Sequence, residues 1–199
     1  SSVEESLYVI EQEATRFRSQ IETCGGEATK WGVIWAAGKA TTASGDDEIR
    51  RELTHFERAI EVLGRHLGQL TDGNFALVSS AGGVYGGSSG PPFTSQSEAV
   101  PLGNYGRLKL AQEELAAGLV GHGMRVLAAR LSNVYGPGQD LDKLQGLISQ
   151  IIVASIRRQP LRMFVPLDTL RDYISADDAA VRTLHWLHFA RDPFSIKVM

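Results

Sequence analysis

Three short runs of hydrophobic residues stand out along the chain, and the stretches between them have a helical pattern. The runs cover residues 32–37, 75–78 and 124–129. Because they lack the alternation of a half-exposed strand, they are typical of strands buried on both faces of a parallel sheet. Helical patterns lie at 5–24, 46–70 and 104–121. Strand and helix thus alternate, which predicts an α/β fold with a doubly wound parallel sheet.

The second half of the chain is less regular. Residues 82–101 are rich in glycine, serine and proline, which indicates a long loop leaving the second strand. Loops of that length in compact domains are often functional. Beyond residue 138 the pattern predicts a helix over 141–158, a short strand over 161–165 and a last helix over 177–189. Ser175 or Asp177 would cap this last helix, and Asp177 and Asp178 are then ordinary acidic residues of its first turn.

The helix over 46–70 carries one continuous apolar stripe. Its members alternate in spacings of four and three residues and are Ile49, Leu53, Phe56, Ile60, Leu63, Leu67 and Leu70. We expect most of the stripe to pack on the sheet of its own chain. The other interpretation is that part of it builds a helix-bundle interface, and we predict a homodimer through helices 46–70 and 104–121.

Composition and charge narrow the class of partner. The chain has 199 residues, 43% of them hydrophobic, and a formal net charge of -3. It is long enough to bury a core, and it lacks the basic excess that binds nucleic acid or an anionic membrane. Its longest apolar run is too short to span a bilayer, and its first residues show no signal sequence. With Cys24 the only cysteine, a cytoplasmic protein acting on a small soluble substrate is the simplest interpretation.

Tyr105 and Lys109 are the first candidates for chemistry. Positions four apart share one face of a helix, so the Lys109 ammonium can lie near the Tyr105 phenol or near a ligand bound between them. A phenol is a poor proton carrier at neutral pH, and a nearby cation favours the phenolate. The second predicted strand ends just upstream at Ser79 and Ser80, and the carboxyl ends of parallel strands bind ligands in such folds. A serine hydroxyl there could hydrogen-bond an oxygen that is oxidised or reduced while Tyr105 moves the proton.

Five ordered segments carry a resemblance to a known family. They are Val33–Gly38, Ser79–Gly86, Tyr105–Lys109, Arg130–Gly138, and Arg171–Ile174 followed by Asp177 and Asp178. Their order and content resemble the extended short-chain dehydrogenases, the NAD-dependent epimerase/dehydratase family that works on nucleotide sugars. The resemblance implies a partial Rossmann-like dinucleotide-binding domain over residues 1–140. Residues 141–199 would form part of a substrate-binding region with a returning strand and helix.

The resemblance also implies roles for individual residues. Tyr105 would be the catalytic acid/base, and Lys109 would hold the nicotinamide ribose and lower the Tyr105 pKa. Ser80 would be the catalytic hydroxyl. Ala36, Ala37, Gly38 and Ser79 would line the cofactor, for which family habit favours NAD over NADP. Asn133 would contact the nucleotide sugar and Arg171 its phosphates, unless Asn133 only forms a turn and Arg171 only a surface salt bridge.

The sequence departs from the family pattern at three places. Nothing before residue 31 resembles the strand, glycine-rich turn and helix that hold the pyrophosphate, so we expect this chain alone to bind dinucleotide poorly. The family also continues beyond the region that ends at Met199, so the substrate pocket is expected to be incomplete. Finally, Ala81 stands where many members have Ser or Thr. Either Ser80 reaches the same spot through a bulge, or Ser88 or Ser89 replaces it.

We therefore expect an NAD(P)-dependent epimerase, dehydratase or reductase acting on a nucleotide sugar, without choosing among the three. Two alternatives stay open: a catalytically silent member that binds a nucleotide or a partner protein, and an NADP-dependent carbonyl reductase. No metal site is expected, because His185 and His188 lack a third ligand at suitable spacing. A cluster of three arginines, Arg157, Arg158 and Arg162, weakly indicates a site for a substrate phosphate. The commoner interpretation is a solvent-exposed helix end.

Overall fold

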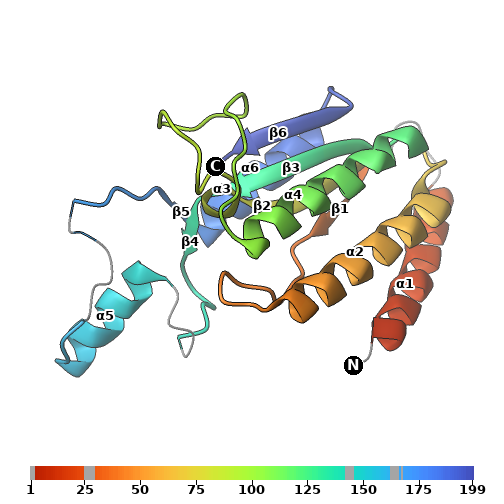
Figure 1. Ribbon diagram of the computed structural model, residues 1–199. Helices are drawn as coiled ribbons and strands as arrows, with labels where there is room; N and C mark the ends of the chain where they lie inside the picture. The colour runs from red at the N-terminus through yellow and green to blue at the C-terminus, as the bar shows by residue number, and fades with distance from the viewer. Residues whose placement is uncertain (1–2, 25–29, 142–145, 162–165, 167) are drawn as a thin grey trace.

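A four-stranded parallel sheet forms the centre of the molecule. The computed structural model describes residues 3–24, 30–141, 146–161, 166 and 168–199. The strands are β1 (Trp31–Trp35), β2 (Gly73–Ser80), β3 (Arg125–Leu131) and β6 (Phe194–Val198), in the spatial order β1-β2-β3-β6 (Figure 1). The first three match the hydrophobic runs, so the predicted parallel sheet is confirmed. β6 was not predicted, although its five residues alternate between apolar and polar side chains, the pattern of a half-exposed strand; the search for continuous apolar runs missed it.

Helices cover both faces of the sheet, as a doubly wound fold requires. On one face lie α2 (Asp46–Leu67) and α4 (Asn104–Ala117), and α1 (Val3–Thr23) packs against α2 (Figure 1). On the other face lies α6 (Ala176–Phe189). The first face buries side chains that include Phe56, Phe75 and Val126. The second buries Ala76 and Leu127 beside Ala179 of α6.

The pleat of β2 explains why its sequence is apolar without alternation. Phe75 and Leu77 belong to the core under α2, whereas Ala76 belongs to the core under α6. Successive side chains of a strand point to opposite faces, so a strand covered on both faces carries apolar side chains on both.

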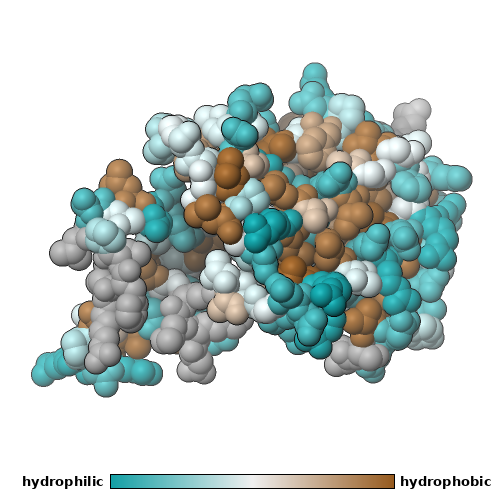
Figure 2. Space-filling view, viewed as in Figure 1, coloured by the Kyte–Doolittle hydropathy of each residue, from teal (hydrophilic) through white to brown (hydrophobic). Residues whose placement is uncertain are grey.

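The apolar stripe of α2 packs mainly within its own chain. Phe56, Ile60, Leu63 and Leu67 are all buried in the core of the first face. Figure 2 shows hydrophobic side chains over α4 and along the seam between α4 and α2, with hydrophilic ones over α1. The homodimer through α2 and α4 stays a prediction.

The second half contains more short elements than the sequence predicts. They are the single turn α3 (Ala81–Val84), the 3₁₀-helix η1 (Gly118–His122), and the paired parallel strands β4 (Asn133–Tyr135) and β5 (Tyr173–Ser175). The helix expected from residue 141 is observed as α5 (Leu147–Arg157), on an arm away from the sheet (Figure 1). It begins only after Gly146, whose φ of 90° lies in the left-handed region. Most of the strand expected over 161–165 lies outside the described residues.

The last helix agrees with its prediction, and its cap is now assigned. The Ser175 hydroxyl accepts a hydrogen bond from the backbone N–H of Asp178, so Ser175 and not Asp177 is the cap. None of the helices in the described parts of the chain is long and apolar enough to cross a membrane.

Candidate active site

The predicted catalytic residues come from two neighbouring elements at one edge of the sheet. Ser80 is the last residue of β2, and Tyr105 and Lys109 lie in the first two turns of α4. Ala36, Ala37 and Gly38 directly follow β1, which pairs in parallel with β2. All these positions therefore lie toward the carboxyl ends of parallel strands, where ligands bind in such sheets.

Two glycines bring Ser80 close to Tyr105. A Cβ added to Gly106 would stand 2.1 Å from the carbonyl oxygen of Gly83, so no larger residue fits where α3 meets α4. A Cβ on Gly83 would in turn stand 3.1 Å from the Tyr105 ring. Ser80 caps α3 by accepting from the Gly83 N–H, at 3.2 Å. Its hydroxyl is thereby within hydrogen-bonding reach of the Tyr105 phenol.

The environment of Tyr105 favours the neutral phenol. Burial raises the pKa of Tyr105, the hydrogen bond with Ser80 lowers it, and the Glu52 charge raises it again, with the net direction upward. That Lys109 lowers this pKa stays a prediction. The Lys109 Nζ lies over the face of the Tyr105 ring, 5.6 Å from its centroid, and burial is the largest cause of the raised Tyr105 pKa.

Lys109 is itself buried, which is uncommon for a lysine. Its Nζ donates a hydrogen bond to Oε1 of Gln112, at 3.0 Å. Burial lowers the pKa of Lys109, and the charges of Glu52 and Glu113 act against that shift. Two carboxylates thus help to keep the buried ammonium charged.

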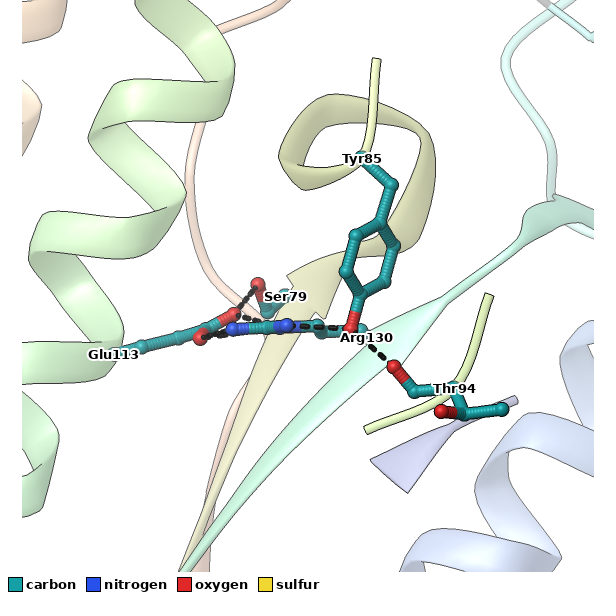
Figure 3. A network of polar contacts seen from close by, with 5 residues as sticks. All are labelled: Ser79, Tyr85, Thr94, Glu113 and Arg130. Atoms are coloured by element: carbon teal, nitrogen blue, oxygen red, sulfur yellow. Dashed lines mark hydrogen bonds and ion pairs between the residues drawn. The ribbon is translucent and has the colours of Figure 1, made fainter. Parts of the chain in front are cut away.

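A buried polar network lies beneath this pair (Figure 3). Arg130 of β3 forms a two-pronged ion pair with Glu113 of α4, with its shortest contact at 2.7 Å. Arg130 also donates to the Tyr85 hydroxyl, which donates to the carbonyl oxygen of Thr94, at 2.8 Å. The network therefore connects the sheet and α4 to the long loop after β2.

Ser79, a predicted cofactor residue, belongs to this network. It is only 3% exposed, and its hydroxyl donates to Glu113 Oε1, at 2.5 Å (Figure 3). Its side chain is therefore committed to α4, which leaves only its backbone for a ligand. Among the other serines considered, Ser88 donates to the Glu98 carbonyl oxygen inside its own loop, whereas Ser80 reaches Tyr105.

The turn after β1 is exposed and held in place by one carboxylate. Ala36, Ala37 and Gly38 are all exposed. Gly38 has a φ of 148°, a conformation that side chains rarely allow. Oε2 of Glu52 accepts from the backbone N–H groups of Lys39 and Ala40, both at 2.7 Å. An open backbone surface of this kind suits a flat ligand.

The two predicted substrate residues lie together, at the β4–β5 pair. Asn133 starts β4, and its Nδ2 donates to the carbonyl oxygen of Asp172, at 2.9 Å. Arg171 is exposed and donates to the neighbouring Leu170 carbonyl oxygen, at 3.0 Å. The structure thus brings Asn133 beside the Arg171 segment, while no described contact joins either residue to Tyr105.

The remaining candidates show no sign of a site. The rings of His185 and His188 both contact Phe189. Within the described ranges, no group of three side chains could hold a metal ion.

Three polar residues of this region were missed by the sequence analysis. Glu113 follows Tyr105 and Lys109 at the same spacing of four residues, so helical periodicity could have placed it on their face. Gln112 lies three residues after Lys109 and is fully buried. Glu52 is the residue before Leu53 of the apolar stripe. An acidic residue so close to the buried face of a helix is a signal that could have marked Glu52 as a candidate.

The parallel sheet, the Tyr105–Lys109 pair on the helix after β2 and the serine at the end of that strand define a protein of the short-chain dehydrogenase class, in its extended form. Residues 33–194 match the model of the NAD dependent epimerase/dehydratase family, and the chain belongs to that family.

Two curated relatives support the assignment over about half of the chain. The chain is 30% identical over 106 residues to dTDP-4-dehydro-6-deoxyglucose reductase of Escherichia coli, covering 51% of this chain and 33% of the relative. It is also 30% identical over 110 residues to dTDP-L-rhamnose 4-epimerase of Burkholderia thailandensis, covering 54% and 30%. The matched region thus spans about a third of each curated relative.

Solved structures show the same fold. UDP-glucose 4-epimerase of Thermotoga maritima, solved with UDP-glucose, superposes with a TM-score of 0.77 at 22% identity, covering 100% of this chain and 60% of that one. MoeE5 in complex with UDP-glucuronic acid and NAD gives a TM-score of 0.70 at 26% identity, covering 84% and 55%.

Proposed function

We propose that the protein containing this chain oxidises or reduces a carbon of a sugar carried on a nucleotide, with Tyr105 as acid/base. The observation that supports this proposal is the grouping of Tyr105, Lys109 and Ser80 at the carboxyl edge of the sheet. Family membership supports the reaction class, and the names of the relatives support a nucleotide sugar as substrate.

Each residue of the group has a separate task. Ser80 hydrogen-bonds the reacting sugar oxygen, and Tyr105 exchanges a proton with it. A bound NAD supplies the hydride acceptor or donor. Tyr105 is neutral at pH 7, and burial raises its pKa further, so it carries the proton that reduction of a ketone requires. The oxidising direction needs the phenolate, and therefore a positive charge near the phenol oxygen.

The residues fit one end of a dinucleotide. Lys109 donates one described hydrogen bond, to Gln112, and an ammonium has three donors, so it has capacity for the hydroxyls of a ribose. The open turn over Ala36–Gly38 suits the flat body of the cofactor. The described residues before β1 form α1, and no strand followed by a glycine-rich turn is found among them to hold the pyrophosphate end. At the substrate end, we assign Asn133 and Arg171 to the nucleotide part.

The test uses the product of the complete gene, incubated with NAD and a panel of UDP- and dTDP-sugars. We expect turnover with at least one nucleotide sugar and a loss of about a hundredfold or more in Tyr105→Phe, with NADH binding by fluorescence largely retained. Tyr8→Phe is the matched control, because Tyr8 is exposed on α1. Full turnover by Tyr105→Phe would overturn the proposal. Turnover of simple ketones alone would favour a carbonyl reductase, and NADH binding without any turnover a silent member.

A further inference from the structure

Glu52 of α2 contacts the turn after β1, and its charge acts on the Tyr105–Lys109 pair. Its Oε2 accepts the two backbone hydrogen bonds that hold Lys39 and Ala40. Its Oε1 is buried and has no hydrogen-bond partner in the described structure. One oxygen of the Glu52 carboxylate therefore accepts two hydrogen bonds, and the other accepts none.

The unpaired oxygen is held in a fixed place. A Cβ added to Gly38 would stand 2.6 Å from Oε1 of Glu52, so the carboxylate packs directly against the turn. Burying a carboxylate oxygen without a partner costs free energy, and proteins usually avoid it. An unpaired oxygen that is also packed in place suggests that Glu52 has a role in the site in addition to its place in α2.

The charged groups around this carboxylate indicate that purpose. The Glu52 charge acts on both Lys109 and Tyr105 of α4, the helix that packs against α2. The other acid that acts on Lys109 is Glu113, which is already neutralised by its ion pair with Arg130 of β3. Glu52 has no such cationic partner among the described ion pairs. It is therefore the main free counter-charge for the buried ammonium.

We propose that Glu52 is a positioning residue of this site, whose Oε2 fixes the turn over Gly38–Ala40 and whose carboxylate, packed against that turn, is a negative counter-charge for the Lys109 ammonium. Its catalytic meaning rests on the proposed function, because a charged Lys109 matters for proton movement at Tyr105. The physical claim itself concerns this chain alone.

The first test measures the charge of Lys109 by NMR without any ligand. The chain has five lysines, so [¹³Cε]lysine gives five signals, and Lys109→Met assigns the one of interest. Glu52→Gln removes the charge and keeps an oxygen that can accept from Lys39 and Ala40. We expect the Lys109 titration midpoint to move to lower pH in Glu52→Gln, since a negative charge favours the ammonium. Glu57→Gln, an exposed change of the same charge on the same helix, should leave the midpoint unchanged.

The second test addresses the turn. Amide hydrogen exchange at Lys39 and Ala40 should become several-fold faster in Glu52→Ala and stay nearly normal in Glu52→Gln, because only the first variant lacks an acceptor oxygen. An unchanged Lys109 midpoint in a folded Glu52→Gln would overturn the electrostatic part. Normal amide protection in Glu52→Ala would overturn the structural part. Neither measurement needs substrate or NAD, so a failure of the proposed function would not affect either outcome.

Discussion

Arg130 and Glu113 form an ion pair whose side chains are only 5% and 6% exposed. Burial alone would lower the pKa of Arg130, and the hydrogen bonds and charge of Glu113 more than offset this, so the guanidinium stays charged. Glu113 also accepts a hydrogen bond from the Ser79 hydroxyl, and Arg130 donates one to the Tyr85 hydroxyl. Four parts of the chain therefore meet at this ion pair. Removing one partner leaves the other charge buried without compensation.

We therefore predict that Arg130→Met destabilises the protein by about 3–5 kcal/mol. The matched control is Arg125→Met, which breaks the half-exposed pair with Asp72 and should cost less than about 1 kcal/mol. Urea denaturation followed by circular dichroism measures both. Equal losses in the two variants would contradict the importance given to burial.

The contact of Gly106 with Gly83 leads to a second prediction. The backbone of Gly83 cannot move aside for a methyl group at 2.1 Å without displacing α3. Gly106→Ala should therefore destabilise the protein by about 1–3 kcal/mol. Gly118→Ala is the control, because no atom lies within 4 Å of its Cβ position and its φ is -57°. That change should be neutral or stabilise by up to about 1 kcal/mol. A harmless Gly106→Ala would show that α3 and α4 are not held this closely.

The elements that the sequence predicts well are those with a strong local signal. The runs at 75–78 and 124–129 correspond to β2 and β3, which are covered on both faces of the sheet and therefore carry apolar side chains on both. Tyr105 and Lys109 were found from one helical spacing. β4 and β5 have three residues each, and their pairing joins positions 40 residues apart, which no local pattern reveals.

Polar residues inside the core were harder to predict, because their role depends on partners from other elements. Ser79 and Ser80 are adjacent and chemically identical, and the sequence assigned both to the ligand site. The pleat of β2 sends Ser79 toward Glu113, whereas Ser80 ends the strand and caps α3. Likewise the direction of the Tyr105 pKa depends on burial, which a motif does not encode.

Ser80 is predicted to be the hydroxyl that serves Tyr105. Ser80→Ala removes the hydroxyl that acts on the phenol and the cap of α3, and should reduce turnover of the complete gene product about tenfold or more. The lost cap alone should lower stability by about 1 kcal/mol. Ser80→Thr keeps a hydroxyl and should restore most of the turnover. Ser88→Ala is the control, and a larger loss there than in Ser80→Ala would assign the catalytic hydroxyl to Ser88 instead.

The raised pKa of Tyr105 predicts how the free energy of unfolding changes at alkaline pH. Its pKa in the folded chain lies above the ordinary value of 10.0, so the folded state holds the phenolic proton more tightly than the unfolded state. The corresponding stabilisation is fully present below pH 10 and is lost as the pH rises through the folded pKa. The effect of Lys109 on the free energy of unfolding has the opposite sign. Its pKa is lowered from 10.5 by folding, so its contribution to stability increases as the pH rises toward 10.5. Because Lys109 is present in both proteins, its effect largely cancels when wild type and Tyr105→Phe are compared.

The wild type should therefore lose more stability than Tyr105→Phe between about pH 9 and pH 11. Urea midpoints measured across this range for wild type, Tyr105→Phe and Tyr8→Phe give the comparison. Tyr8 is exposed, so its variant should follow the wild type. Parallel curves for wild type and Tyr105→Phe would mean that the phenol ionises as easily in the folded chain as in the unfolded one. In that case the upward shift of the Tyr105 pKa on burial would have to be abandoned, although the phenol would still be neutral at pH 7.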